Sequence, residues 1–339
     1  MPETSDKNPL TEAQANFASK LSFRSLAAET VTLTNALNRI SYKDIKAPMD
    51  SPPYARAIVE GYLVNTPETR RADENSQVQF KINGEIKPGE ETAASPAAGE
   101  GILVATGSLI PAGDFSIVRM WEADVDDATG GTQFSISRAF PPGFFIEAQG
   151  CDVEKNHVVV NAGDKITPEI IGTLASLGIN KIKVSAIPRV TIFASGDEVL
   201  AHTDTFKPGY IFDCNTPMLS AAVQAAGATA IAGGIQSDDF KAFVKTLKTA
   251  LSNSDMIVIA GGTAVGGRDF ISDLLKETGE LIQDGVQMRS GRPLIMGITN
   301  EKPIVCVAGH PPEALRGFKL FGSLALNHLT GHSKALPED

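Results

Sequence analysis

The stretch that decides the fold is DMIVIAGGTAVGGRD, residues 255–269. An apolar run of strand length leads directly into a loop that carries four glycines in seven residues, 261–267. Such a loop lets backbone N–H groups approach an anion closely, and a following helix adds its positive end. It lacks the GK[ST] ending of a Walker loop and the spacing of a dinucleotide GxGxxG. The stretch therefore predicts a buried strand that ends at an anion-binding turn.

Strands and helices alternate on both sides of this stretch, from about residue 187 onward. The expected strands are RVTIFAS (189–195), ATAIAGGI (228–235) and KPIVCVAG (302–309), and the expected helices are 216–228, 237–253 with Ser237 as N-cap, and one from Pro312. Such alternation predicts a mostly parallel sheet with helices on both faces. Ligands of these sheets bind outside the carboxyl ends of the strands.

Tight turns of small residues follow three of the expected strands, at 195–198, 261–269 and 309–312. Each turn alone reads equally well as a plain strand-to-helix connection, because short motifs often match by chance. Three such turns at one edge of a single sheet favour a shared pocket.

Charged residues gather at the same edge. Asp197, Glu198, Asp238 and Asp269 follow expected strands, and carboxylates beside a phosphate site commonly hold Mg²⁺. Asp238 reads equally well as a first-turn acid that suits a helix dipole. Arg289 and Arg292 bracket a turn, where they either grip an oxyanion or stand as two solvated loop cations.

The N-terminal half has a different pattern. Residues 1–19 are expected to form a polar tail, and residues 21–40 one helix followed by a loop. Between 54 and 145, short apolar runs alternate with turn-rich stretches, which predicts a small all-β module.

Composition limits the class of protein. The chain has 339 residues, 42% of them hydrophobic and 21% charged, with a formal net charge of −10 and a pI near 5.1. So acidic a protein is a poor candidate for non-specific binding to nucleic acid or to an anionic membrane. The three cysteines form neither a disulfide framework nor a zinc motif. With no signal peptide or membrane-length apolar run in view, a cytoplasmic protein is expected.

The motifs, in their order and spacing, resemble those of the molybdopterin molybdenumtransferase family, which includes the gephyrin E domain. The family's TGDEL motif matches residues 195–199, its isoleucine-tyrosine-aspartate-serine-asparagine run 211–215, its GGVSVG…D loop 261–269, its KPGKP turn 289–293, and its PGNP turn 308–311. In the N-terminal half, PPFDNSAMDGYAV resembles residues 52–62, TGAPLPEGAD resembles 106–115, and a GxD turn matches 150–152.

The resemblance implies an α/β fold in which residues 186–332 form a three-layer α/β/α molybdopterin-binding domain with a mostly parallel sheet. It implies a mixed N-terminal domain from 20–50 and 146–185, a β-rich insertion at 51–145, and tails at 1–19 and 333–339. Family members bind adenylylated molybdopterin, release AMP and load molybdate with the help of a divalent metal. The implied cofactor is Mg²⁺, the implied substrate is molybdopterin or its adenylate, and the oxyanion is molybdate or tungstate.

The resemblance also implies roles for particular residues. Ligand binding falls to Thr106, Ser195, Gly196, Asp197, Gly261, Gly262, Thr263, Gly266, Arg289, Arg292, Gly309 and His310. Catalysis falls to Glu198, Asp238, Asp269, Glu60 and Asp152, of which the first three also hold the metal. Because the family dimerises with its N-terminal domains reaching the partner's pocket, Glu60, Thr106 and Asp152 are expected to complete a site in the other subunit.

The chain departs from the family pattern at several positions. Glu60 stands for an aspartate, Phe115 for another aspartate, and Ala264 for a serine. Both lysines of KPGKP are arginines here, and the asparagine of PGNP is His310. The chain stops at Asp339, where typical members continue into a small β domain of roughly 70 residues, so that domain is expected to be missing.

These departures leave two alternatives beside each other. The favoured one is an active transferase, since the charge types are largely kept. The other is a non-catalytic molybdopterin carrier or a partner of other molybdenum-cofactor proteins. A pure interaction module, as in gephyrin-type domains that bind receptor peptides, is disfavoured because it would not need the acidic cluster.

Overall fold

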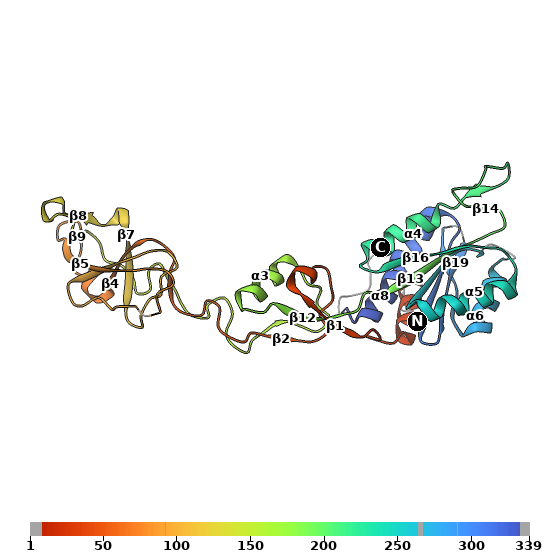
Figure 1. Ribbon diagram of the computed structural model, residues 1–339, viewed down its shortest axis with the longest axis horizontal. Helices are drawn as coiled ribbons and strands as arrows, with labels where there is room; N and C mark the ends of the chain where they lie inside the picture. Colours follow the sequence, from red (N-terminus) through yellow and green to blue (C-terminus); the bar gives the residue numbers. More distant parts are fainter. Residues whose placement is uncertain (1–8, 92, 264–266, 290, 333–339) are drawn as a thin grey trace, which may run out of the picture. The chain divides into compact units, whose positions relative to one another are not determined.

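The computed structural model describes residues 9–91, 93–263, 267–289 and 291–332; for residues 9 and 267–269 it describes the backbone only. The chain forms two compact units (Figure 1). The α/β unit comprises residues up to 44, 160–171 and 180 onward, and the β-rich unit comprises 45–159 and 172–179. The sequence assigned 20–50 and 146–185 to a separate mixed domain, whereas the contacts group 20–44 and 180–185 with the α/β unit.

A six-stranded sheet in the order β16-β13-β17-β20-β19-β18 forms the centre of the α/β unit. Its strands are β13 (Arg189–Ser195), β16 (Thr229–Gln236), β17 (Met256–Gly261), β18 (Glu280–Met288), β19 (Gly291–Thr299) and β20 (Lys302–Val307). β13 is parallel to β16 and β17, β17 is parallel to β20, and β19 and β18 extend the sheet antiparallel. The prediction of a mostly parallel sheet is confirmed.

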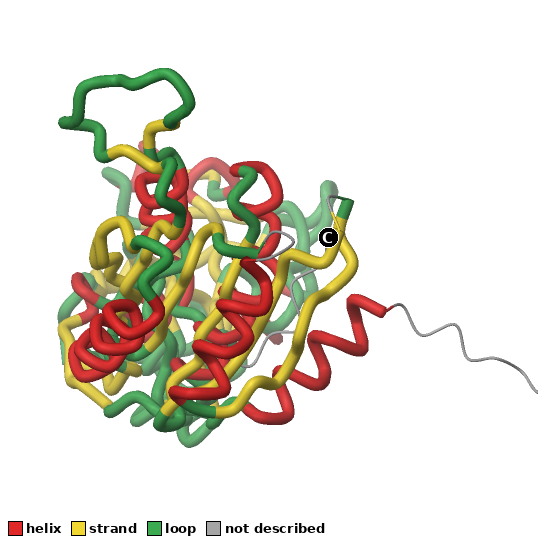
Figure 2. Tube along the Cα trace, turned by 90° about the vertical axis from the view of Figure 1, so that its right-hand side faces the viewer, coloured by secondary structure: helices red, strands yellow, loops and turns green. Residues whose placement is uncertain are grey.

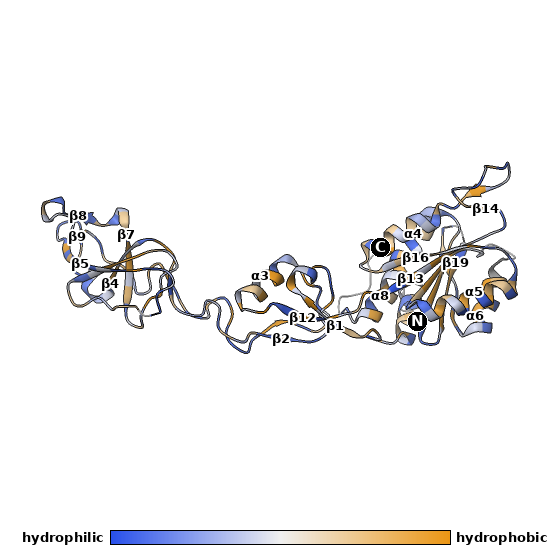
Figure 3. Cartoon of the chain, in the orientation of Figure 1, coloured by the Kyte–Doolittle hydropathy of each residue, from blue (hydrophilic) through white to orange (hydrophobic). Residues whose placement is uncertain are grey.

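Helices cover both faces of this sheet, as Figure 2 shows. They are α1 (Pro9–Lys20), α4 (Asn215–Ala225), α5 (Phe240–Asn253), α6 (Gly267–Thr278), α7 (Pro311–Gly317), a π-helical turn (Phe318–Gly322) and α8 (Ser323–Thr330). Met256 and Val258 of β17 enter a core shared with α1, α4, α7 and α8, and Ile257 and Ile259 enter a second core with α5 and α6. Because both of its faces are covered, β17 is buried at every position, and strands at the centre of the sheet are largely apolar (Figure 3).

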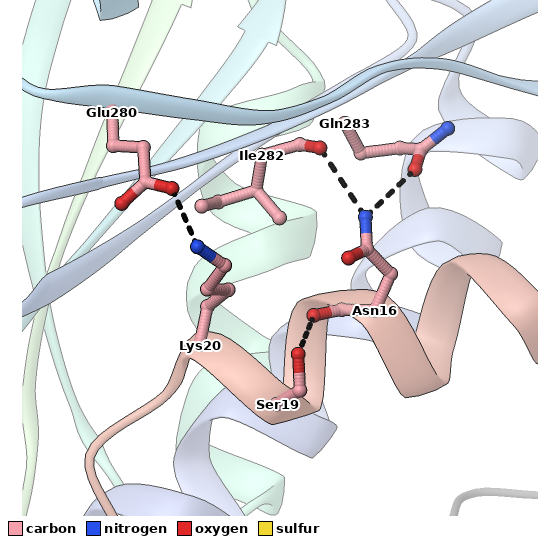
Figure 4. Close-up of polar contacts among 6 residues, drawn as sticks. All are labelled: Asn16, Ser19, Lys20, Glu280, Ile282 and Gln283. Carbon is pink, nitrogen blue, oxygen red and sulfur yellow. Dashed lines mark hydrogen bonds and ion pairs between the residues drawn. The ribbon is translucent and has the colours of Figure 1, made fainter.

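Helix α1 packs on the edge strand β18 (Figure 4). The Asn16 side-chain amide donates to the carbonyl of Ile282 at 3.3 Å, and Lys20 Nζ lies 2.8 Å from the carboxylate of Glu280. Ala13 and Phe17, one helical turn apart, enter the core. The polar tail predicted for residues 1–19 is therefore wrong over 9–19, because these residues form an amphipathic helix that buries Ala13 and Phe17.

The helix predicted over residues 21–40 is also wrong. Strand β1 (Ala28–Thr32) and a short 3-10 turn (Leu33–Asn35) occupy this region, and β1 pairs antiparallel with β12 (Lys181–Ser185). Three of the five residues of β1 are threonine or valine, and β-branched side chains favour the pleated conformation over the helix.

A short two-stranded ribbon stands out from the α/β unit, labelled β14 in Figure 1 and seen at the top of Figure 2. β14 (Val199–Leu200) pairs with β15 (Ile211–Phe212) in parallel. Phe206 and Ile211 are more than half exposed on this ribbon and its connecting loop. The ribbon leads from the turn after β13 to the start of α4, so it links two segments at the carboxyl edge of the sheet.

The β-rich unit contains a second six-stranded sheet, in the order β7-β4-β6-β5-β9-β8. Its strands are β4 (Gly61–Asn65), β5 (Val78–Ile86), β6 (Glu100–Val104), β7 (Phe115–Arg119), β8 (Asp124–Val125) and β9 (Gln133–Ile136). The shorter elements of the chain are β2 (Ile45–Lys46), β3 (Arg56–Ala57), α2 (Thr66–Thr69), 3-10 turns at Met120–Glu122 and Asp127–Thr129, β10 (Ile146–Glu147), β11 (Val158–Val160) and α3 (Pro168–Ser176). Two apolar clusters fill this unit, one around Leu63 and Ile117 and one around Phe80 and Phe134.

Within the described ranges, no helix combines the length and the apolar character that crossing a bilayer requires.

Candidate active site

The carboxyl ends of β13, β17 and β20 open into a cleft of about 400 Å³. Ser195 lies opposite Gly261 where β13 pairs with β17, and Ala260 lies opposite Val307 where β17 pairs with β20. The turns after these strands therefore begin at one edge. The cleft brings together seven residues that the sequence predicted for the site: Ser195, Glu198, Gly261, Gly262, Thr263, Gly309 and His310.

Two glycines let the strand ends approach each other closely. Gly261 has a φ of 95°, and a Cβ there would lie 2.5 Å from the carbonyl oxygen of Ser195. Gly262 has a φ of 67°, and a Cβ there would lie 3.1 Å from the hydroxyl of Ser195. Side chains at either position would therefore strain the backbone and fill the space between β13 and β17.

Ser195 presents a hydroxyl with unused hydrogen-bonding capacity. The residue is 5% exposed, and its Oγ finds no partner within the described part of the chain. Buried hydroxyls without partners are rare in folded proteins. The hydroxyl is therefore available to a ligand in the cleft.

Three carboxylates gather beside the turn after β13. The backbone N–H of Asp238 donates to Oδ1 of Asp197 at 3.3 Å, and the carboxylate of Glu198 lies over Gly196, where a Cβ would be 2.6 Å from Oε2. Burial raises the pKa of Asp238, and the negative charges of Asp197 and Glu198 raise it further. Negative charge is therefore concentrated at this side of the cleft.

The start of α5 differs from the expected one in a way that bears on Asp238. The N-cap is Asp239, whose Oδ1 accepts from the N–H of Ala242 at 3.0 Å, and not Ser237. Asp238 thus precedes the helix, and the interpretation as a first-turn acid is wrong. Its carboxylate remains exposed next to Asp197.

The two arginines of the 289–293 turn are exposed at the junction of β18 and β19. Arg292 Nη2 donates to the carbonyl of Gly285 at 2.8 Å, and the neighbouring Pro293 is the residue of this turn that lines the cleft. The predicted Gly266 lies outside the described residues. Asp269 lies in α6, and its side chain is outside the described part of the structure.

Two cleft residues were not singled out from the sequence, Asp213 and Asn215. Asp213 is 8% exposed, and its Oδ1 accepts from the N–H of Thr216 at 3.0 Å, which caps the start of α4. Asn215 Nδ2 donates to the carbonyl of Gly309 at 2.7 Å. The signal was present in the 211–215 motif, but nothing in the sequence shows that the ribbon returns this segment to the cleft.

The remaining predicted residues, Glu60, Thr106 and Asp152, lie in the β-rich unit, and all three are exposed. Asp152 is grouped with Glu147 and Cys151, and one ligand atom of each lies within 4.8 Å of the others. Within the described ranges, this is the one set of three metal-ligating residue types that meets so closely. The described side chains of Asp197, Glu198 and Asp238 do not come together this closely.

Phe115 occupies a position where the family pattern has an aspartate. Its side chain is 6% exposed and belongs to the core of the β-rich unit. The ring covers Gly113, where a Cβ would lie 2.3 Å from it. An acid is therefore replaced here by a packing residue, while the adjacent Asp114 is exposed.

Comparisons with known proteins cover both halves of the chain. Residues 8–178 match the MoeA N-terminal region (domain I and II), and residues 191–328 match a probable molybdopterin binding domain. A putative molybdopterin biosynthesis protein of Methanocaldococcus jannaschii is 34% identical over 300 residues, which cover 86% of this chain and 72% of that protein. A molybdopterin molybdenumtransferase of Staphylococcus aureus is 27% identical over 332 residues, covering 97% and 78%.

Solved structures agree with this result. Two structures of a MoeA molybdopterin biosynthesis protein of Pyrococcus horikoshii superpose with TM-scores of 0.78 and 0.81 at 28% and 26% identity. Both alignments cover 96% of this chain, and 81% and 80% of the respective structures. With the sheet, the strand-end turns and both matched regions in the same order, the chain belongs to the MoeA family of molybdopterin molybdenumtransferases, which acts in molybdenum cofactor biosynthesis.

Proposed function

We propose that this chain binds adenylylated molybdopterin at the cleft of the α/β unit and transfers molybdate, or tungstate, to it with release of AMP. The observation that carries the proposal is that one cleft contains close glycine turns, the carboxylate of Glu198 and the buried hydroxyl of Ser195, which has no partner among the described residues. The glycine turns and the hydroxyl suit phosphate oxygens, which accept hydrogen bonds. The volume of about 400 Å³ lies within the range of small-molecule sites.

The acidic side of the cleft suits Mg²⁺ in its donor chemistry. Asp197, Glu198 and Asp238 offer hard oxygen ligands. Desolvation raises the pKa of Asp238 most, and the negative charges of Asp197 and Glu198, which a cation would offset, raise it further. Asp197, Glu198 and Asp238 would hold the cation, which would supply positive charge beside the phosphate. Ser195 would orient the phosphate by donating a hydrogen bond to it.

The two exposed arginines of the 289–293 turn have the charge and donor geometry to bind an oxyanion. Arg289 and Arg292 stay charged at any working pH and present planar donor groups that match an oxyanion. Within the described part of the chain, the hydrogen-bond acceptors of Arg292 are the neutral carbonyls of Asp284 and Gly285. We propose that these side chains attract molybdate or tungstate to the rim.

The assay for this proposal measures AMP released from adenylylated molybdopterin in the presence of molybdate and Mg²⁺. Glu198→Gln removes a cleft charge with little change in volume, and we expect it to slow AMP release at least about hundredfold, the scale on which single electrostatic groups act in catalysis. Glu301→Gln, in an exposed turn away from the cleft, is the matched control and should release AMP at the unaltered rate. Full activity of Glu198→Gln, or the same rate of AMP release with and without Mg²⁺, would refute the proposed role of the carboxylates in holding Mg²⁺.

One observation favours a second function, that of a molybdopterin carrier. Phe115 places an aromatic ring in the core where the family pattern supplies a carboxylate. If that carboxylate is needed for turnover, the chain would bind the pterin without releasing AMP. Bound molybdopterin with no AMP after prolonged incubation would establish the carrier, and restored turnover in Phe115→Asp would identify the cause.

We also propose that the chain acts as a homodimer, as the family resemblance implies. Glu60, Thr106 and Asp152 are exposed in the β-rich unit, which leaves them available to a second copy. Mixing Glu198→Gln with Asp152→Asn tests this, because subunits that share sites recover part of the activity that each variant lacks. Additive loss without recovery would place these residues outside a shared site.

A further inference from the structure

The side-chain amide of Asn215 has a fixed orientation. Asn215 is the first residue of α4, and its Nδ2 donates to the carbonyl oxygen of Gly309 at 2.7 Å. A rotated amide would set Oδ1 against that carbonyl, and two acceptors repel each other. The amide nitrogen must therefore face Gly309, and Oδ1 is the atom left for another partner.

Oδ1 of Asn215 is nevertheless buried without a donor among the residues that the structure describes. Ser195 Oγ and Thr216 Oγ1 share this condition, and both Ser195 and Asn215 line the cleft. A buried polar atom loses its hydrogen bonds to water, and this loss costs free energy unless another partner replaces them. Three such atoms in or beside one cleft, with Ser195 only 5% exposed, indicate a ligand that supplies the missing partners.

The two cleft atoms require different chemistry from that ligand. The hydroxyl of Ser195 can donate to a phosphate oxygen, and the glycine turns adjoin it. The amide oxygen of Asn215 only accepts, so it would repel phosphate or molybdate oxygens. The group opposite Asn215 must carry an N–H or O–H donor, which lies on the organic part of a phosphorylated ligand.

We propose that Asn215 determines specificity by accepting a hydrogen bond from an N–H or O–H group of the ligand, while Ser195 donates to its phosphate. This inference rests on the proposed function and adds how the cleft distinguishes an organic phosphate from a bare oxyanion. The donor belongs to one of three parts of adenylylated molybdopterin: a ribose hydroxyl, the amino group of adenine, or an N–H of the pterin ring.

Calorimetric titration of three probes into the full chain separates these sources. The probes are AMP, 2′,3′-dideoxy-AMP and molybdopterin, and the variant is Asn215→Leu, which keeps the branched heavy-atom shape and has neither acceptor nor donor. If the ribose is the donor, the variant weakens AMP binding about tenfold, a loss typical of one hydrogen bond, and dideoxy-AMP binds both proteins alike. If the pterin is the donor, the variant weakens molybdopterin binding and leaves both nucleotides unchanged. If the adenine amino group is the donor, the variant weakens AMP and dideoxy-AMP alike and leaves molybdopterin unchanged.

Several outcomes would overturn the inference. Equal weakening of all three probes would mean that Asn215 acts only through its bond to Gly309. Unchanged binding of all three would mean that Asn215 contacts none of these ligands. If the unaltered chain bound neither AMP nor molybdopterin, the proposed function would fail first and this inference with it. Asn253→Leu, at the exposed end of α5, is the matched control, and Asn215→Ala replaces the leucine variant should the latter fail to fold.

Discussion

At the scale of single residues, the cleft depends on a glycine that faces backbone. Gly261 combines a φ of 95° with a Cβ position 2.5 Å from the carbonyl oxygen of Ser195. Gly209 has a similar φ of 89°, yet nothing lies within 4 Å of its Cβ position. The pair therefore separates conformational strain, which both share, from crowding, which only Gly261 has.

We expect Gly261→Ala to lower the free energy of unfolding by about 2–4 kcal/mol, since the strain of a left-handed residue adds to a backbone clash. Gly209→Ala should cost only about 1 kcal/mol, from the strain alone. Urea denaturation of both variants measures the two losses. Equal losses would show that the close approach of β13 and β17 carries no energetic weight.

Single residues also show what the sequence can and cannot specify. The sequence located Ser195 and Gly261 because their turns follow strongly apolar strands, and parallel strands bring such turns to one edge. It did not single out Asn215, because the residue reaches the cleft only through the ribbon β14–β15 and through its bond to Gly309. Long-range hydrogen bonds of this kind produce no periodic pattern in the sequence.

At the scale of elements, the predictions succeeded where burial imposes a regular pattern. β17 is apolar at every position because both of its faces are covered, and α5 buries Phe243, Leu247 and Leu251 at helical spacing. Helix α1 was missed because its apolar face is small, with Ala13 and Phe17 buried and Leu10 and Ala18 partly buried. Its stability comes from its position on β18 and not from its own sequence.

We expect Phe17→Ala to lower the free energy of unfolding by about 3–5 kcal/mol, because a fully buried ring leaves a cavity when removed. Ser19→Ala, on the same helix, removes only a bond from the hydroxyl to the carbonyl of Asn16, and should cost less than about 0.5 kcal/mol. Thermal and urea unfolding give both values. A small loss for Phe17→Ala would mean that α1 does not stabilise the α/β unit.

At the scale of the whole molecule, the chain contains two units with separate cores. The sequence predicted a β-rich module followed by alternating strands and helices, because the hydrophobic period changes along the chain. It could not place residues 20–44, since β1 finds its partner β12 about 150 residues further along (Thr32 with Lys181). Sequence patterns report local period, and the assignment of a segment to a unit depends on distant pairing.

We expect calorimetric unfolding to show two transitions, because separate cores unfold with limited cooperativity. Phe134→Ala should lower the midpoint of only one, since Phe134 is stacked between Tyr62 and Phe80 inside the β-rich unit, with ring centroids 4.3 and 5.4 Å away. Phe243→Ala, in the α/β unit, is the matched counterpart and should lower the other midpoint. A single transition that both variants shift equally would show that the two cores unfold as one.

The position of α1 has a consequence for how the protein is made. The helix is synthesised well before its docking site, because Gln14 bonds to the carbonyl of Leu320, 306 residues further along the chain. At about 5–20 residues per second, its landing place is synthesised only some tens of seconds later. During that interval the core that receives Phe17 is incomplete, so the nascent chain carries an exposed apolar ring until the segment around Leu320 and Phe321 has been synthesised.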